Sequence, residues 1–338
     1  MPDRVVAVVI AARNASGTIT RAVRSALREP EVVEVVVVDD ASTDDTAAAV
    51  RAADDGSGRL DILRLDANRG PAAARNLAIG RSSAPFIAIL DADDCYLEGR
   101  FRYIFDAGDW DIAADNVMFV EAVTEAAETA IPAAGVPPRW LGLEEFIEGN
   151  ISRWRQHRDE LGFLKPVVSR SFMDAHGLRY NEALRLGEDY ELYVRALARG
   201  ARFRISPACG YLATVRANSL SGSHRTEDLR RQADADRALL RMEGLPEGAR
   251  AALKRHERHV RDKYRLRRFL DRKAEGGMAS ALAFAFSSAE NPFPIARGVA
   301  ADKVRALRRN VVPNFAKSDQ PPVRFLMQAP RAGDDTPT

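Results

Sequence analysis

The chain has 338 residues, of which 46% are hydrophobic and 29% are charged, so the composition excludes a disordered protein and predicts a globular core. Two cysteines provide neither a disulfide framework nor a CxxC metal site, which favours a reducing compartment such as the cytoplasm. No apolar run reaches the roughly eighteen residues that a membrane span needs, and the N-terminus has no signal-peptide pattern.

The net charge is only +2, but it is unevenly distributed along the chain. Residues 249–273 contain eleven Lys or Arg and three acidic residues, whereas the chain before residue 249 is acidic overall. An acidic body with a basic C-terminal region indicates that the basic region meets something anionic. The alternative interpretation is a charged helix surface that contacts only water.

The first ninety residues alternate between patterns of buried strands and patterns of helices. Short apolar runs read as strands buried on both faces, at residues 4–12, 34–38, 60–65 and 86–90. Helices with one apolar face are expected between them, at residues 16–27, from residue 42 onward and at residues 71–79. This alternation predicts an α/β fold with a doubly wound, mostly parallel sheet and right-handed connections.

The run from Phe86 to Leu90 ends abruptly in Asp91, Asp93 and Asp94. Charge cannot stay inside such a sheet, so the carboxylates must emerge at the carboxyl end of the strand, where open α/β sheets bind ligands. Asp91 and Asp93 are two residues apart and point the same way on an extended backbone. Two oxygen-rich groups on one side suit Mg²⁺ or Mn²⁺, which in turn holds phosphate oxygens. The alternative is an acidic turn.

Polar residues also follow the first two strands. Arg13 and Asn14 follow the first, and Asp39 and Asp40 follow the second. Because strand ends converge in a parallel sheet, these side chains can line one crevice with the aspartate cluster. The first turn has no GxGxxG pattern, which argues against a dinucleotide-binding half. For Asp39 and Asp40 the alternative is turn chemistry with a helix cap.

The stretch from residue 110 to residue 224 is less regular. Strand patterns occur at residues 111–120, 201–205 and 211–215, and helix patterns at residues 143–151 and after Gly187. Trp140 and Trp154 are candidates for stacking on an acceptor sugar, although a tryptophan that anchors a loop to the core is the alternative. Glu188 and Asp189 open the later helix, where the helix dipole stabilises carboxylates. Simple helix capping is the competing interpretation there.

In this order and spacing, five segments resemble bacterial family 2 glycosyltransferases of the GT-A fold. They are Val9 to Asn14, Val37 to Asp44, Asn68 to Asn76, Leu90 to Asp94 and Gly187 to Leu192. The resemblance covers about residues 5–222 and is nearest to exopolysaccharide enzymes of the succinoglycan type. It implies an inverting transfer of a sugar from a nucleotide donor, usually linked to UDP, to a glycan acceptor.

The resemblance also implies residue roles. Asp189 would be the catalytic base, and Asp93 would bind the divalent cation, Mg²⁺ or Mn²⁺, that bridges the donor diphosphate. Asp40 would hydrogen-bond the nucleotide base, usually uracil, and Asp91 would lie near the ribose or sugar. The other donor contacts implied are the backbone of Ala11 and the side chains of Arg13, Arg75 and Arg216.

Two of these positions depart from the family pattern. The family often has Tyr where this chain has Arg13, which puts the contacts at that point in doubt. His224 falls a few positions later than the family histidine, so it is a candidate rather than an assigned phosphate or metal contact. Glu188 is a further candidate for acceptor binding, next to the base.

Three parts are expected along the chain: a GT-A catalytic domain at residues 1–224, a basic helical region at residues 225–312 and a disordered tail at residues 313–338. The resemblance implies work in exopolysaccharide or other cell-surface polysaccharide synthesis, with an acceptor that can be linked to polyprenyl diphosphate. Such an enzyme would be cytoplasmic and peripheral on the inner face of the membrane, where the basic region would contact anionic lipid. No nucleic acid partner is expected.

Three other activities compete with this interpretation. A sugar-phosphate nucleotidyltransferase would need a glycine-rich basic loop after the first strand, which residues 11–17 lack. A haloacid-dehalogenase-type phosphatase would carry its DxD near the N-terminus, whereas Asp91 follows three earlier β-α units. A catalytically inactive sugar-nucleotide-binding scaffold should have lost one of the two carboxylate centres, and both are present.

Overall fold

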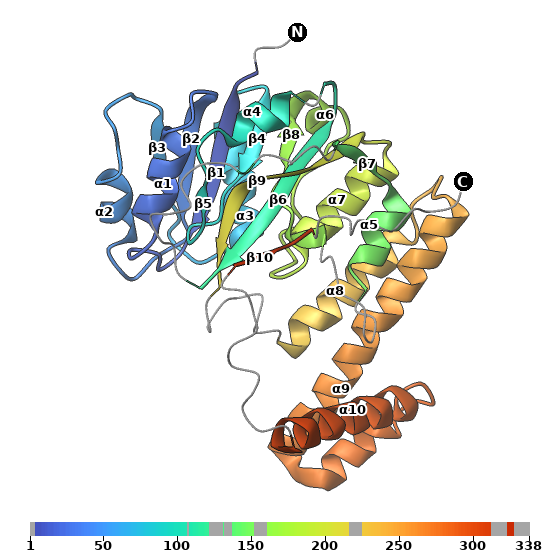
Figure 1. Cartoon of the computed structure of the whole chain (residues 1–338). Coiled ribbons are helices and arrows are strands. Elements are labelled where there is room, and N and C mark those ends of the chain that lie inside the picture. The colour runs from blue at the N-terminus through green and yellow to red at the C-terminus, as the bar shows by residue number, and fades with distance from the viewer. Residues whose placement is uncertain are drawn as a thin grey trace. The chain divides into compact units, whose positions relative to one another are not determined.

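The strand patterns of the first ninety residues form one half of a mixed sheet in the computed structural model (Figure 1). The structure describes residues 4–106, 108–121, 131, 137–151, 161–215, 225–311 and 323–327. Contacts within the chain define two compact units, residues 1–217 with 322–338 (the sheet unit) and residues 218–321 (the helical unit). The predicted domain boundary at residue 224 lies outside the described residues.

Four parallel strands begin the sheet. They are β1 (Val6–Ala12), β2 (Val32–Asp39), β3 (Leu60–Arg64) and β4 (Phe86–Ile89), in the spatial order β3-β2-β1-β4. The helices between them are α1 (Ile19–Leu27), α2 (Thr46–Arg51) and α3 (Pro71–Arg81). Residues 6–10 of β1 are fully buried, as its apolar run on both faces requires. The predicted parallel α/β half is confirmed.

Beyond β4 the sheet becomes mixed. Its further strands are β5 (Cys95–Tyr96), β6 (Ile112–Val120), β7 (Arg139–Leu141), β8 (Val167–Ser169) and β9 (Phe203–Thr214). The order continues β4-β8-β6-β9-β5; β8 is antiparallel to both of its neighbours, and β6 and β9 are parallel. The two short strands predicted at residues 201–205 and 211–215 are one continuous strand, β9.

Shorter helices flank this second half. They are α4 (Arg100–Phe105), α5 (Leu143–Gly149), the 3₁₀ helix η1 (Leu161–Phe163), α6 (Arg170–Ala175) and α7 (Glu188–Ala198). Helix α7 is the most buried of them, and both Tyr190 and Tyr193 point into an aromatic cluster with Phe146 of α5. Its first turn is therefore held firmly relative to the sheet.

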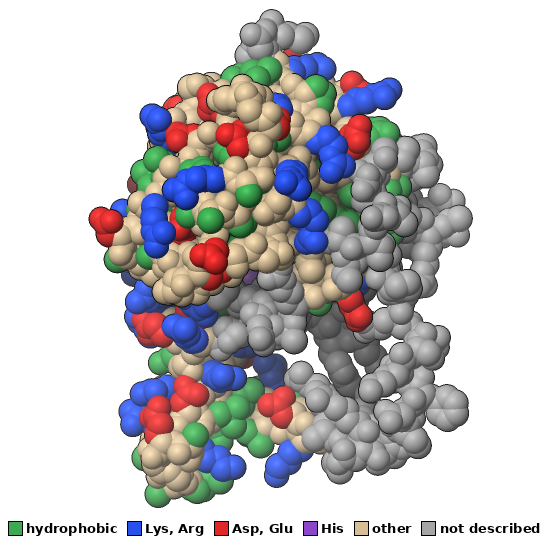
Figure 2. Space-filling view, turned by 90° about the vertical axis from the view of Figure 1, so that its left-hand side faces the viewer, with side chains coloured by type: hydrophobic (Ala, Val, Ile, Leu, Met, Phe, Trp, Pro, Cys, Tyr) green, Lys and Arg blue, Asp and Glu red, His purple; other side chains and the backbone are tan. Residues whose placement is uncertain are grey.

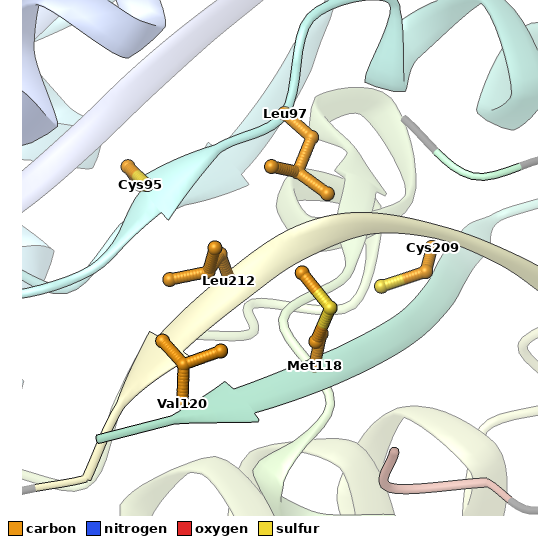
Figure 3. Packing of buried hydrophobic residues seen from close by; sticks show 6 residues of the cluster. All are labelled: Cys95, Leu97, Met118, Val120, Cys209 and Leu212. Atoms are coloured by element: carbon orange, nitrogen blue, oxygen red, sulfur yellow. The ribbon is translucent and has the colours of Figure 1, made fainter. Parts of the chain in front are cut away.

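An apolar cluster fixes β5 against β9 and β6. It contains Cys95, Leu97, Met118, Val120, Cys209 and Leu212, whose side chains face one another in Figure 3. Both cysteines are free and buried, so each acts as a small apolar side chain, as expected in the absence of a disulfide framework. Because β5 directly follows the aspartate cluster, this packing anchors the turn that carries it.

A short C-terminal segment joins the sheet unit, where the sequence predicts only a disordered tail after residue 313. Strand β10 (Val323–Phe325) pairs antiparallel with β6. Asn116 holds the backbone of Met327 from both sides, donating to its carbonyl and accepting from its N–H, each at 2.8 Å. Phe325 packs on the apolar cluster, and Leu326 is buried. The prediction of disorder is wrong for this segment, because its residues pair with β6 and pack on the apolar cluster.

The helical unit consists of α8 (Thr226–Leu239), α9 (Glu247–Ala285) and α10 (Pro292–Val311). Both α8 and α10 pack on α9, which is kinked at Gly276 and Gly277, where the backbone leaves helical values. Small apolar clusters stabilise the two contacts, around Val260 on one side and Phe269 on the other. Within the described ranges, no helix is both long and apolar enough to cross a membrane.

Candidate active site

The aspartate cluster lies in the turn between β4 and β5. Asp94 is buried; it accepts hydrogen bonds from the hydroxyl of Tyr211 at 2.8 Å and from the N–H of Thr214 at 2.9 Å. Burial, together with the charges of Asp91 and Asp93, outweighs these bonds and raises the pKa of Asp94 to about 8. Asp94 therefore holds the turn on β9 mainly as a neutral acid near pH 7.

Asp91 and Asp189, far apart in the sequence, meet through two cations. Arg75 donates to Asp91 at 2.7 Å, to Asp189 at 3.3 Å and to Glu188 at 2.8 Å. The ammonium of Lys165 lies 2.8 Å from Asp91 and 3.0 Å from Asp189. The structure thus brings four of the predicted site residues into one buried ion network and adds Lys165, which the sequence analysis missed.

This network sets the protonation of its members. Burial alone would raise the pKa of Asp91, but the charges of Lys165 and Arg75 more than offset it and hold that pKa well below its usual range. Burial would lower the pKa of Lys165, but Asp189 and Asp91 raise it above the ordinary value. For Glu188, burial and the charge of Asp189 raise the pKa despite Arg75. The site therefore keeps Asp91 ionised and both cations charged.

Local sequence explains how these side chains reach the site. Gly70, with φ at +88°, precedes Pro71 at the start of α3, and Arg75 follows on the second turn of that helix. Gly187, in the left-handed region at φ +81°, likewise precedes α7, so Glu188 and Asp189 occupy its first two positions. Carboxylates at this position are favoured by the helix dipole. The two helix starts therefore present one cation and two anions to each other.

Asp40 has a structural task that the sequence did not reveal. It is buried, and its two oxygens accept the backbone N–H groups of Arg69 at 2.7 Å and Gly70 at 2.8 Å. It thus fixes the loop that leads into α3 and Arg75. Asp39 caps its own turn by accepting from Ser42 N–H at 2.9 Å. A contact between Asp40 and a nucleotide base stays a prediction.

The turns after β1 and β2 are tied together at the same edge of the sheet. The backbone N–H of Asn14 donates to the hydroxyl of Ser42 at 2.9 Å, and its side-chain oxygen accepts from Thr43 N–H at 2.8 Å. Asn14 and Ala41 both have positive φ, at +49° and +54°, a conformation that a non-glycine residue holds at a cost in energy. Strained backbone of this kind gathers at ligand sites, and the crevice beside Ala11 and Arg13 stays a prediction.

The structure describes only some of the candidate acceptor and phosphate contacts. Trp140 lies half exposed on β7, and the guanidinium of Arg204 sits over its ring at 5.1 Å from the centroid. That contact agrees with the alternative interpretation of an anchoring tryptophan. Trp154, Arg216 and His224 lie outside the described residues.

The carboxylates of the aspartate cluster differ in how well they suit a divalent cation. No group of three or more His, Cys, Asp or Glu side chains able to hold a metal by itself occurs in the part of the chain that the structure describes. Both oxygens of Asp91 are bound by cations, and both oxygens of Asp94 accept hydrogen bonds, from Tyr211 and Thr214. Asp93, half buried in the same turn, stays the predicted metal ligand. One carboxylate suits Mg²⁺ or Mn²⁺ that takes its other ligands from phosphate and water.

Lys165 and Arg100 were not singled out from the sequence. Arg100 is fully buried, pairs with Asp115 at 2.7 Å and donates to the backbone carbonyl of Lys165. The one sequence signal near them is the Lys165-Pro166 pair, because a residue before proline is held in an extended conformation. Nothing in the local pattern names the partners, which lie many residues away along the chain.

Comparison with known proteins identifies the family. The model of glycosyl transferase family 2 matches residues 7–156. The chain is 51% identical to succinoglycan biosynthesis protein ExoU of Rhizobium meliloti (strain 1021), over 96% of this chain and 95% of that protein. Its identity to succinoglycan biosynthesis protein ExoO of the same organism is 38%, over 88% and 86%. It is also 25% identical to the Escherichia coli UDP-Glc:alpha-D-GlcNAc-diphosphoundecaprenol beta-1,3-glucosyltransferase WfgD, over 69% and 86%.

Solved structures share the fold. S. aureus TarS 1–349 in complex with UDP-GlcNAc superposes with a TM-score of 0.58 at 18% identity, covering 90% of this chain and 83% of that one. The mannosyltransferase PcManGT of Pyrobaculum calidifontis, in complex with GDP-Man and Mn²⁺, gives a TM-score of 0.52 at 18% identity, over 91% and 83%. The fold is therefore GT-A, as the resemblance implies. The chain belongs to glycosyl transferase family 2 and is a glycosyltransferase.

Proposed function

We propose that the protein is an inverting, metal-dependent transferase that moves a sugar from a UDP-linked donor to a glycan acceptor in the synthesis of a succinoglycan-type exopolysaccharide. The names of its relatives ExoU and ExoO support the pathway. WfgD supports both a UDP-sugar donor and an acceptor on a polyprenyl diphosphate, since its name contains both. The complex of TarS with UDP-GlcNAc supports the same class of donor.

The observation that carries this proposal is the shared ion network of Asp91 and Asp189. Arg75 and Lys165 each contact both carboxylates, so the aspartate cluster at the end of β4 and the first turn of α7 face each other across two side chains. A donor held at the cluster would lie beside a second, separate carboxylate. Direct displacement at an anomeric carbon needs groups on both sides of that carbon, and the presence of two carboxylate groups from different elements supports such a mechanism.

In the proposed reaction, Asp189 accepts the proton of the acceptor hydroxyl as its oxygen attacks the anomeric carbon. The bond between that carbon and the diphosphate oxygen breaks on the opposite side, so the configuration inverts and the nucleoside diphosphate leaves. Each oxygen of Asp189 contacts a cation and keeps a second lone pair. That lone pair is the one available to the hydroxyl proton.

The donor contacts follow the roles that the family resemblance implies. Asp93 would hold a divalent cation, which supplies Lewis-acid neutralisation of the leaving diphosphate when bound. Ala11, Arg13 and Asp40 would border the nucleoside. The proposed contacts of the diphosphate are Arg216 and His224, which lie outside the described residues. The proposed contacts of the acceptor are Trp140, Trp154 and Glu188.

An acceptor on a polyprenyl diphosphate would bring the enzyme to the inner face of an anionic membrane, and the helical unit has a surface that fits it. Met278 and Leu282 on α9 and Phe286 directly after its end follow one another at intervals of four residues, and Phe293 lies in the first turn of α10; both phenylalanines are almost three-quarters exposed. Figure 2 shows Lys and Arg side chains beside hydrophobic ones on the helices. Near an anionic leaflet each basic residue contributes about 1 kcal/mol of attraction.

A screen of nucleotide sugars tests the proposal. The purified protein is incubated with UDP-, GDP- and dTDP-linked sugars, with Mn²⁺ or with EDTA, and release of the nucleoside diphosphate is measured with and without a lipid-linked glycan acceptor. We expect release that depends on Mn²⁺, is highest with one UDP-sugar and rises with acceptor. Release of pyrophosphate from a sugar phosphate and a nucleoside triphosphate would instead identify a nucleotidyltransferase. Binding of the donor without any turnover would identify an inactive scaffold.

A further inference from the structure

Two buried cations close a ring of four side chains in the site. Lys165 lies 2.8 Å from Oδ2 of Asp91 and 3.0 Å from Oδ2 of Asp189. Arg75 contacts Oδ1 of the same two residues, at 2.7 and 3.3 Å. Every carboxylate oxygen of Asp91 and Asp189 is therefore bound by a cation. Because each carboxylate is held at both oxygens, neither can rotate without breaking a charged contact.

The backbone at Lys165 is fixed by a second layer of buried contacts. Its carbonyl accepts a hydrogen bond from Arg100, which is itself held by Asp115 at 2.7 Å. Proline follows at position 166 and restricts the backbone of Lys165 to extended values. A buried ammonium is unfavourable unless it is paired. Lys165 is paired with two carboxylates, and its backbone is held as well, so its position in the site is fixed.

We infer that Lys165 is a positioning residue of the transfer reaction: together with Arg75, it holds Asp189 at a fixed place relative to the donor-side carboxylate Asp91. The inference rests on the proposed function, because it takes Asp189 as the base. It assigns Lys165 no contact with substrate. Its effect is exerted through Asp189, which must meet the acceptor hydroxyl in one geometry.

The charges around Asp189 explain why Arg75 alone would not hold its carboxylate in place. Asp189 is faced by Arg75 from α3, by Lys165 from the segment before β8, by Asp91 from the end of β4, and by Glu188 and Tyr180 from its own side of the site. Three carboxylates thus share two cations. Without Lys165, Arg75 would serve all three, and Oδ2 of Asp189 would lose the cation that now holds it. The base would then be misplaced.

A competing role for Lys165 is direct binding of the donor diphosphate, for which lysine is a common point charge. The two roles differ in what is lost with the lysine. A positioning residue changes kcat and leaves nucleotide affinity nearly intact. A diphosphate ligand lowers nucleotide affinity first.

Three variants separate these roles. Lys165→Met removes the charge at similar length, Lys165→Arg retains it, and Arg102→Met removes a cation from the exposed surface of the sheet unit as the matched control. For Lys165→Met we expect kcat to fall by about 10²-fold, the scale of a misplaced catalytic group. UDP affinity by calorimetry should stay near the wild-type value. Lys165→Arg should recover part of kcat, and the control should match wild type.

An outcome in which Lys165→Met keeps its kcat, or loses UDP affinity as strongly as kcat, overturns the inference. A wild-type protein without turnover on any nucleotide sugar overturns the proposed function, and the inference with it. Normal wild-type turnover with an unaffected Lys165→Met variant overturns the inference alone.

A second measurement does not depend on turnover. Urea unfolding of Lys165→Met, Asp189→Asn and the double variant forms a double-mutant cycle. We expect each single change to destabilise the protein and the double change to destabilise it by less than the sum, because no charge is then left without its partner. Additive effects would mean that the two side chains do not support each other and would contradict the ring.

Discussion

The hydroxyl of Tyr211 on β9 donates a 2.8 Å hydrogen bond to the carboxylate of Asp94, 117 residues earlier in the chain. The same hydroxyl accepts from the backbone N–H of Asp91 at 3.1 Å. One buried side chain therefore fixes both ends of the aspartate turn to the sheet. Because Asp94 is crowded by Asp91 and Asp93, this fixation has a pH dependence.

We predict that Asp94 makes the protein less stable as the pH rises. Burial and its acidic neighbours raise the pKa of Asp94 to about 8, far above its usual value, so the folded state binds a proton that the unfolded state has lost. The stabilisation is complete below the usual carboxyl pKa of about 4 and is lost as the pH rises towards about 8. Asp94→Asn mimics the neutral acid and removes this dependence.

Urea unfolding of wild type and Asp94→Asn at several pH values between 5 and 9, in EDTA to exclude bound metal, measures the difference. The free energy of unfolding of the variant should increase relative to that of the wild type as the pH rises to about 8, and the difference should then stay constant. A difference that does not change with pH, or one that changes in the opposite direction, would show that Asp94 is ionised throughout.

We predict that Asp40→Ala weakens UDP binding and leaves Mn²⁺ affinity nearly unchanged. It also removes the acceptor of two backbone N–H groups, and hydrogen bonds to a charged group contribute about 1.5–3 kcal/mol each, so stability should fall as well. Calorimetry with UDP, on protein shown to be folded by circular dichroism, measures the affinity. Equal UDP affinity of wild type and folded variant would leave Asp40 with the loop-anchoring task alone.

We predict that Asp93→Ala abolishes the part of UDP binding that requires Mn²⁺, because the diphosphate loses its metal bridge. Asp109→Ala, which changes an exposed aspartate in the same unit, serves as the matched control and should bind as wild type does. Binding is compared with Mn²⁺ and with EDTA. Retention of the Mn²⁺ effect in Asp93→Ala would remove this residue from the metal site.

We predict that the helical unit binds anionic membranes through charge and through its exposed phenylalanines. The protein should sediment with anionic liposomes at low salt, less at high salt and not with neutral liposomes. Phe286→Ser with Phe293→Ser should weaken sedimentation and leave UDP release unchanged, whereas Val33→Ser, at an exposed apolar residue of β2, should change neither. Equal sedimentation with neutral lipid, or none at low salt, would contradict an electrostatic membrane surface.

The first half of the fold and its polar strand ends could be predicted because their signals are local. Short apolar runs that stop at Arg13, Asp39 and Asp91 predict buried strands that end at these residues. The second half gave weaker signals, since β5 and β8 have only two and three residues and no period to recognise. Their place in the sheet is decided by packing against distant strands.

The same distinction explains which site residues were missed. Asp189 stands out because it opens a helix after a glycine, beside a second carboxylate. Lys165 has no such context: its partner Asp189 is 24 residues away, and their meeting depends on how β8 and α7 pack. Asp40 shows the converse. The sequence marks it as a polar strand end, but its bonds to the amides of Arg69 and Gly70 follow from a loop that only the folded chain brings near.

The most direct test of this account is the turnover of Asp189→Asn with the donor that the screen identifies. As the general base, Asp189 should contribute about 10²-fold or more to kcat, so the variant should bind UDP-sugar almost as wild type does and transfer sugar at least about 10²-fold more slowly. If the variant instead loses donor affinity while its residual kcat stays high, Asp189 is not the base and the proposed mechanism is wrong.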